Sequence, residues 1–181
     1  EPVDPPAVRR DFNFDYGSSL RQNSFINSPA LHDQGILGEG VMIGVCDAGF
    51  DNLDHECFSD LRIIAAWDFV NGDAEVGNQN DRGIGEHGTR CLSIIAGMAP
   101  GHLIGIAPNA SYVLAKTENS QAEEPVEEDA WIAAAEWMDS LGVETYTALV
   151  DSVFGNISLD TVAISDPISG NIKILTVQDS A

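Results

Sequence analysis

Apolar and polar residues alternate along this chain in blocks that predict strands followed by helices. Residues 41–46 (VMIGVC) form a continuous apolar run of strand length, which is typical of a strand buried in a parallel sheet. Residues 61–70 and 111–117 are two further strand candidates. Helical spacing of apolar residues begins at His87 and again over residues 126–141. This order predicts an α/β domain, with a parallel sheet flanked by helices.

The two longer helices have predicted buried faces. For the helix after His87, the residues expected to share a face are Cys91, Ile94, Ile95 and Met98. For residues 126–141, the expected face consists of Ala130, Ala134, Trp137, Met138 and Leu141. A shorter helix is expected within residues 24–35, where Ser28 caps the first turn and Pro29 lies in it.

Composition changes near both ends of the chain and predicts three regions. Residues 1–20 begin with a proline-rich, charged stretch, which predicts a flexible arm. Residues 21–143 carry the alternating strands and helices. Residues 144–181 are rich in Thr, Ser, Val and Ile, and a turn signal at residues 166–171 (DPISGN) separates two apolar stretches. We therefore expect a β-rich C-terminal segment that includes a β-hairpin.

The charge balance excludes some partners. The chain has 29 acidic and 8 basic residues, a formal net charge of -21. Nucleic acid is not an expected partner, because phosphate binding requires clustered Lys and Arg. No run of eighteen or more apolar residues predicts a membrane span, and the polar start does not resemble a signal peptide. Three cysteines, Cys46, Cys57 and Cys91, are too few and too far apart for a disulfide framework or a zinc knuckle.

Asp47 follows the first predicted strand directly. Open α/β sheets hold their sites at the carboxyl ends of strands, although a carboxylate there also serves as a simple cap or loop residue. Residues 40–51 (GVMIGVCDAGFD) resemble the aspartate motif of the subtilisin-like serine peptidase family, in which a strand delivers the triad aspartate ahead of a small residue and a glycine. Cys46 stands where that family more often has an aliphatic residue.

Two later segments resemble the same family. Residues 86–91 (EHGTRC), with Ala96 and Gly97 downstream, resemble its histidine motif, although Arg90 replaces the usual second histidine. Residues 105–110 (GIAPNA) resemble its Gly-x-Ala-Pro-x-Ala stretch. The resemblance covers roughly residues 16–143.

The resemblance implies an incomplete subtilisin-like fold and hydrolysis of protein or peptide substrates through an Asp-His-Ser triad. It also implies a location outside the cell or in its envelope. In this scheme Asp47 accepts a hydrogen bond from Nδ1 of His87, and Nε2 of His87 is the general base.

The nucleophile of that triad is not identified. The family's Gly-Thr-Ser-x-x-x-Pro segment does not occur, and residues 154–156 (FGN) resemble its oxyanion-hole Gly-Asn but are expected to be a loop. The late serines lack the required strand-turn-helix context; they are Ser152, Ser158, Ser165, Ser169 and Ser180. Two hypotheses follow: a serine endopeptidase that is truncated or inactive as this chain, or a non-catalytic remnant that keeps the fold for binding or structure.

No cofactor is required for this chemistry. Cys91 stands where thiol-dependent members of the family carry a cysteine beneath the active site, and a small buried apolar residue is the plain alternative. An acidic stretch is compatible with a weak structural calcium site or with a solvated loop; its residues are Asp47, Asp51, Asp54, His55, Glu56 and Cys57.

Overall fold

A computed structural model describes six stretches of the chain, namely residues 13–79, 85–122, 125–143, 145–151, 158–165 and 172–178. Its main feature is a six-stranded sheet with the strand order β2-β5-β1-β6-β7-β8. The strands are β1 (Met42–Asp47), β2 (Arg62–Asp68), β5 (Ser111–Lys116), β6 (Thr145–Asp151), β7 (Ser158–Ser165) and β8 (Ile172–Gln178). The pairs β2–β5, β5–β1 and β1–β6 are parallel, so the predicted α/β fold with a parallel sheet is confirmed.

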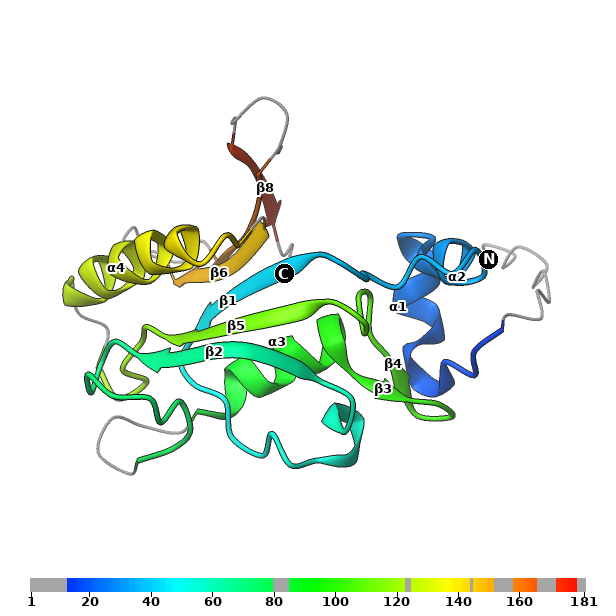
Figure 1. Cartoon of the computed structure of the whole chain (residues 1–181), viewed down its shortest axis with the longest axis horizontal. Helices are drawn as coiled ribbons and strands as arrows, with labels where there is room; N and C mark the ends of the chain where they lie inside the picture. The colour runs from blue at the N-terminus through cyan, green and yellow to red at the C-terminus, as the bar shows by residue number, and fades with distance from the viewer. Residues whose placement is uncertain are drawn as a thin grey trace, which may run out of the picture.

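Helices and short elements surround this sheet. They are η1 (Gly17–Ser19), α1 (Leu20–Phe25), α2 (Ser28–His32), η2 (Glu56–Phe58), α3 (Glu86–Ala96) and α4 (Val126–Ser140), with a two-stranded sheet of β3 (Met98–Ala99) and β4 (Leu103–Ile104). Figure 1 shows α3 and α4 beside the sheet, and the N-terminal helices α1 and α2 at the right-hand end of the sheet. No helix in the described ranges has the length and apolar character that crossing a membrane requires.

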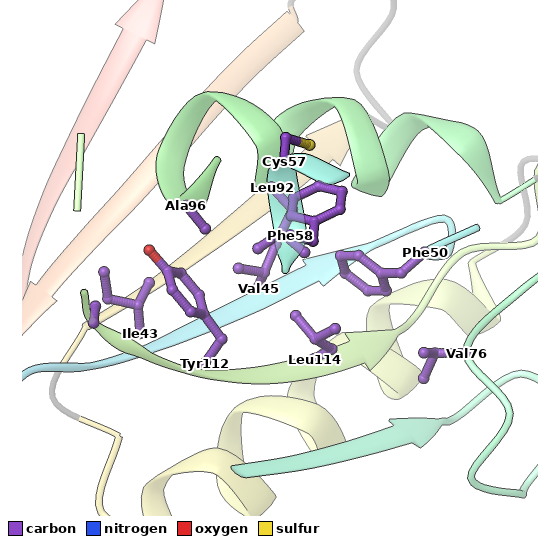
Figure 2. Close-up of a cluster of buried hydrophobic side chains, with 11 residues drawn as sticks. Ile43, Val45, Phe50, Cys57, Phe58, Val76, Leu92, Ala96, Tyr112 and Leu114 are labelled. Carbon is purple, nitrogen blue, oxygen red and sulfur yellow. The ribbon is translucent and has the colours of Figure 1, made fainter. Parts of the chain in front are cut away.

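Alternate residues of the central strands face two separate cores. Tyr112 and Leu114 of β5 pack with Leu92 and Ala96 of α3, as Figure 2 shows. The intervening residues of β5 instead join the core beneath α4, where Val113 is fully buried. Successive side chains of a strand point to opposite faces, so a central strand with both faces covered must be apolar at nearly every position. This explains the unbroken apolar run that precedes Asp47.

The predicted face of α3 is correct at Ile95, which packs against the core, but wrong at Ile94. Ile94, expected to be buried, is 45% exposed, whereas Leu92 and Ala96 are fully or almost fully buried. The inward-facing row begins at Gly88 and continues at four-residue intervals, a spacing that also defines one helix face. From spacing alone, the larger apolar side chains of α3 were expected to face the sheet. The helix instead turns its Gly88, Leu92 and Ala96 row toward the sheet, because a close contact with β1 needs a residue without a side chain.

The face of α4 was predicted more accurately. Ala134 and Met138 are fully buried against the sheet, and Trp137 is partly buried in the same core. Leu141 is 38% exposed, so its predicted burial is not found. It follows the last helical residue and lies at the C-terminal cap, where the chain turns away from the sheet.

Residues 1–12 of the predicted N-terminal arm (residues 1–20) lie outside the described residues, the described part of the arm is partly buried, and the expected shorter helix is present with a different N-cap. Tyr16 and Ser19, within the predicted arm, are buried, and the hydroxyl of Ser19 accepts a hydrogen bond from the Ile104 amide over 3.0 Å. At least residues 16–19 therefore pack against the domain. The expected helix in residues 24–35 is α2, whose N-cap is Asn27 rather than Ser28.

The C-terminal segment contains the expected β-hairpin and one further strand that was not predicted. β7 and β8 pair antiparallel, which confirms the predicted hairpin; its turn, residues 166–171, lies outside the described residues. β6 was not predicted, yet it pairs in parallel with β1 from Ile43 to Cys46. The β-rich segment therefore continues the main sheet, because β6 also pairs antiparallel with β7.

A buried ion pair joins the carboxyl ends of β2 and β5. Lys116 Nζ lies 3.0 Å from Asp68 Oδ2, and both side chains are almost completely buried. The other carboxylate oxygen of Asp68 accepts the backbone amides of Val70 and Asn71 over 2.7 and 2.8 Å. The pair thus fixes the loop that leaves β2 against the central strands.

We expect Lys116→Met to lower the free energy of unfolding by about 3–5 kcal/mol, because it leaves the Asp68 charge buried without its counter-ion. Urea unfolding followed by circular dichroism measures this. Arg90→Ala is the matched control, since its ion pair with Glu86 is exposed and is worth less than about 1 kcal/mol. Equal losses in the two variants would contradict the structural role of the buried pair.

Candidate active site

Asp47 is the last residue of β1, between the neighbouring strands β5 and β6. Its side chain is 2% exposed, and Oδ1 accepts a hydrogen bond from the Ala48 amide over 2.7 Å. The backbone amide of Thr117 donates to its carbonyl oxygen over 2.9 Å, which fixes the end of the strand. A carboxylate at this point is held rigidly at the edge where open α/β sheets place their sites.

His87 reaches this carboxylate from the first turn of α3. Its Nδ1 lies 2.8 Å from Asp47 Oδ1 and 3.0 Å from Oδ2. Because an ionised carboxylate only accepts hydrogen bonds, this contact places the proton on Nδ1 and makes Nε2 the acceptor nitrogen of the neutral ring. The His87 side chain is 46% exposed, so the ring is accessible although its partner is buried.

Close packing between α3 and the segment after β1 sets this distance. A Cβ at Gly88 would lie 2.4 Å from the Gly49 carbonyl oxygen and 2.9 Å from Asp47 Cβ. Thr89 Oγ1 donates to the Asp51 carbonyl over 2.6 Å, and the Asp51 amide donates to Gly85 over 3.0 Å. The residues beside His87 in the histidine motif therefore hold the helix against the segment that follows Asp47.

Burial determines the electrostatics of the pair. Desolvation raises the pKa of Asp47, while the hydrogen bond and the charge of His87 and the Ala48 amide act in the opposite direction. Removing the carboxylate from water is the larger effect. The buried charge is thus tolerated because specific donors face it.

Cys91 lies one helical turn after His87, beside its ring. Cys91 Sγ is 3.8 Å from both ring nitrogens. Asp47, His87 and Cys91 form a group whose ligand atoms all lie within 4.8 Å of one another, and no other such group occurs among the described residues. The acidic stretch from Asp51 to Cys57 accordingly does not converge on a common point, although a structural calcium ion stays a prediction.

The other two cysteines lie apart from this cluster. Cys46 faces the α4 core, where its thiol lies 3.8 Å from Met138 Sδ and burial raises its pKa to about 12. Cys57 is buried, and its Sγ lies 3.2 Å from His55 Nδ1. All three are free thiols.

Several sequence-based candidates cannot be placed. Residues 154–156 and the serines at 152, 169 and 180 lie outside the described residues. Ser158 and Ser165 are the end residues of β7, of which the structure describes the backbone. The roles of Gly88 and Thr89 were not predicted from the sequence; their position directly after His87 was the available signal.

An α/β sheet that presents a buried aspartate to a histidine on the next helix points to a hydrolase of the triad type. A model described as the subtilase family matches residues 38–146, more than half of the chain. The chain therefore belongs to the subtilase family, as the three motif segments predicted.

Individual relatives cover much of this chain but little of their own length. Subtilisin E of Bacillus subtilis (strain 168) is 29% identical over 153 residues, which are 83% of this chain and 37% of that protein. Neuroendocrine convertase 2 of Homo sapiens is 29% identical over 82 residues, which are 45% of this chain and 13% of that protein. This chain thus corresponds to a minor part of each relative.

Solved structures agree with the fold. Fervidolysin from Fervidobacterium pennivorans superposes with a TM-score of 0.57 at 17% identity, over 80% of this chain and 22% of that one. MycP1 from the ESX-1 type VII secretion system gives a TM-score of 0.55 at 16% identity, over 85% of this chain and 40% of that one. At these identities the likeness supports the architecture alone.

We expect Gly88→Ala to lower the free energy of unfolding by about 1–3 kcal/mol, the usual cost of forcing a methyl group into a packed contact. Urea unfolding measures the loss. Ile94→Ala serves as the control, because it changes an exposed side chain of the same helix. If Gly88→Ala proved no more costly than the control, α3 would not need its close approach to β1.

The raised pKa of Asp47 predicts a pH-dependent stability difference between the wild-type chain and Asp47→Asn. An acid whose pKa is raised in the folded state stabilises that state most when it is protonated. The stability of the wild-type chain relative to Asp47→Asn should therefore decrease as the pH rises above 3.8, the ordinary aspartate value, and level off beyond the folded-state pKa.

Urea unfolding at a series of pH values measures this difference. Asp60→Asn, at an exposed aspartate, controls for the loss of one negative charge. A relative stability that increased with pH over the same interval would contradict the dominance of desolvation at Asp47.

Proposed function

We propose that this chain provides the aspartate and histidine of a subtilisin-type serine endopeptidase, with Asp47 as the orienting carboxylate and His87 as the general base. The observation that carries the proposal is the pair of contacts, 2.8 and 3.0 Å, between His87 Nδ1 and the Asp47 carboxylate. With Nδ1 engaged in this way, Nε2 is the nitrogen that accepts a proton from a serine hydroxyl. Family membership supports the same chemistry.

Asp47 is buried and His87 is partly exposed, and each environment suits the role proposed for the residue. The carboxylate is shielded from water, so its attraction for an imidazolium that forms during the reaction is stronger than at the surface. The ring lies in the first turn of α3, which holds it beside the carboxylate. His87 is exposed enough to meet a substrate.

Arg90, which stands in place of the second histidine of the motif, does not compete for Asp47. Its guanidinium lies 2.8 Å from Glu86 Oε1, and both side chains are exposed. This contact is an i,i+4 surface pair, which contributes little to stability. The substitution thus leaves the Asp47–His87 contact undisturbed.

The nucleophile has to come from a serine in a segment that the structure does not describe or that lies beyond these residues. Among the described residues, no serine hydroxyl hydrogen-bonds to the His87 ring. The substrates in this proposal are proteins or peptides, and the location is outside the cell or in its envelope. The excess of acidic residues supports the exclusion of nucleic acid as a partner.

A second candidate function is a non-catalytic one, in which the fold is kept for binding or structure. The observation that favours it is the hairpin of β7 and β8, which continues the sheet directly after β6. Antiparallel strands at that position differ from the βα units that precede them. In this case the Asp47–His87 pair would be a structural remnant.

The two functions are distinguished by labelling with a fluorophosphonate probe, which reacts with an activated serine. We expect the gene product that contains this sequence to take up one probe at a single serine and to hydrolyse a peptide substrate. His87→Ala should lower kcat/KM by about four orders of magnitude, the size of loss typical when a triad member fails. Mass spectrometry locates the labelled serine.

The control for this experiment is His102→Ala, because His102 is exposed and lies outside the candidate site. It should keep both labelling and turnover. A gene product without a labelled serine and without turnover would overturn the peptidase proposal in favour of the non-catalytic one. Full activity in His87→Ala would exclude His87 as the base.

A further inference from the structure

Three different ligand-type side chains meet at the carboxyl end of β1. Asp47 comes from the strand, and His87 and Cys91 lie one turn apart on α3, so that both side chains share a helix face. Their ligand atoms all lie within 4.8 Å of one another. A carboxylate, an imidazole and a thiolate are the three side-chain ligands that zinc uses in proteins.

The distances within this cluster approach those around a tetrahedral zinc ion. With zinc–ligand bonds of about 2.0–2.3 Å, sulfur and nitrogen on one ion are about 3.5 Å apart, and oxygen and nitrogen about 3.3 Å apart. The structure has 3.8 Å between Cys91 Sγ and His87 Nδ1, and 2.8 Å between Nδ1 and Asp47 Oδ1. The third separation, between Cys91 Sγ and the Asp47 carboxylate, is at most 4.8 Å, against about 3.6 Å on one tetrahedral ion. Shifts of up to about an ångström therefore convert one arrangement into the other.

The partly exposed His87 ring allows the adjustment that metal binding requires. The sulfur lies 3.8 Å from both ring nitrogens, so it stands beside the ring rather than in line with Nδ1. A turn of the imidazole about its Cβ–Cγ bond aims Nδ1 between the sulfur and the carboxylate, and the exposed His87 side chain permits this turn. A water molecule supplies the fourth ligand, as in zinc sites with three protein ligands. The net charge of -21 attracts cations to the surface.

We propose that Asp47, His87 Nδ1 and Cys91 Sγ bind a divalent ion of the zinc type, which replaces the hydrogen bond between Asp47 and His87. Binding releases the thiol proton of Cys91 to solvent, and the Nδ1 proton of His87 moves to Nε2. No group is oxidised or reduced.

Metal binding and general-base catalysis exclude each other at this site. In the metal-bound form Nε2 carries the proton, so it cannot accept another from a nucleophile while the ring stays neutral. This consequence rests on the proposed function, whereas binding of the ion does not. Any peptidase that uses this Asp47–His87 pair is thus inhibited reversibly by zinc.

The experiment titrates the reduced 181-residue chain with Co²⁺, a spectroscopic substitute for zinc, and then adds Zn²⁺. We expect one equivalent of Co²⁺ to give the intense visible bands of a tetrahedral ion together with a thiolate charge-transfer band, and Zn²⁺ to abolish both. Cys91→Ser should remove the charge-transfer band and weaken Zn²⁺ binding by more than about tenfold, because even outer-shell changes cost 10- to 100-fold. Circular dichroism verifies that the variant is folded.

Cys57→Ser is the matched control, since Cys57 also lies beside a histidine but belongs to no three-ligand group in the described part of the chain. It should leave the cobalt spectrum unchanged. A spectrum that is lost in Cys57→Ser and kept in Cys91→Ser would overturn the proposal, as would the absence of tetrahedral cobalt bands in the wild-type chain.

A second measurement needs no variant. Alkylation of Cys91 by iodoacetamide, followed by peptide mass mapping of the wild-type chain, should become at least about tenfold slower with saturating Zn²⁺. An unchanged alkylation rate would contradict the proposal even if Cys91→Ser failed to fold. Neither measurement depends on peptidase activity, so failure of the metal site and failure of the proposed function are distinguishable.

Discussion

The contact between the first turn of α3 and the segment after β1 is the constraint on which this structure depends. At Gly88 there is no room for a Cβ, because the Gly49 carbonyl oxygen and Asp47 Cβ occupy the space. The helix therefore approaches the strand end closely enough for His87 Nδ1 to reach the Asp47 carboxylate over 2.8 Å. The same approach explains why the buried row of α3 begins with glycine and why Ile94 faces outward.

Buried charge is the second theme, in a protein whose surface is strongly acidic. The charge of Asp68 is paired with Lys116, and its carboxylate accepts hydrogen bonds from backbone amides. This aspartate therefore fixes a loop and is not available for chemistry. Asp47 has no lysine or arginine partner in the described residues, and its pKa is raised by desolvation. Its partner is the imidazole of His87, 2.8 Å away. Two aspartates at the carboxyl ends of β1 and β2, the strands on either side of β5, thus differ in chemistry because their partners differ.

Cys91 adds a third potential metal ligand to the Asp47–His87 pair. A thiol one helical turn after His87 lies beside the imidazole ring and within 4.8 Å of the Asp47 carboxylate. Cys46, adjacent to Asp47 in sequence, faces the opposite core instead, because successive strand residues point to opposite faces. Cys46, next to Asp47 in sequence, therefore lies outside the site, whereas Cys91, 44 positions after Asp47, belongs to it.

The sequence by itself determined three strands of the sheet, the two longer helices, the α/β class, the family, and the two residues of the candidate pair. These features depend on local periodicity and on short motifs, which are properties of contiguous residues. It failed at β6, at the buried face of α3 and at the packed residues around Tyr16. Each of these depends on which distant segment lies alongside, as β6 does on β1 and Ser19 on Ile104. Only the tertiary structure decided the distances among His87, Cys91 and Asp47, because these arise from the packing of a helix against a strand end and not from spacing in the chain.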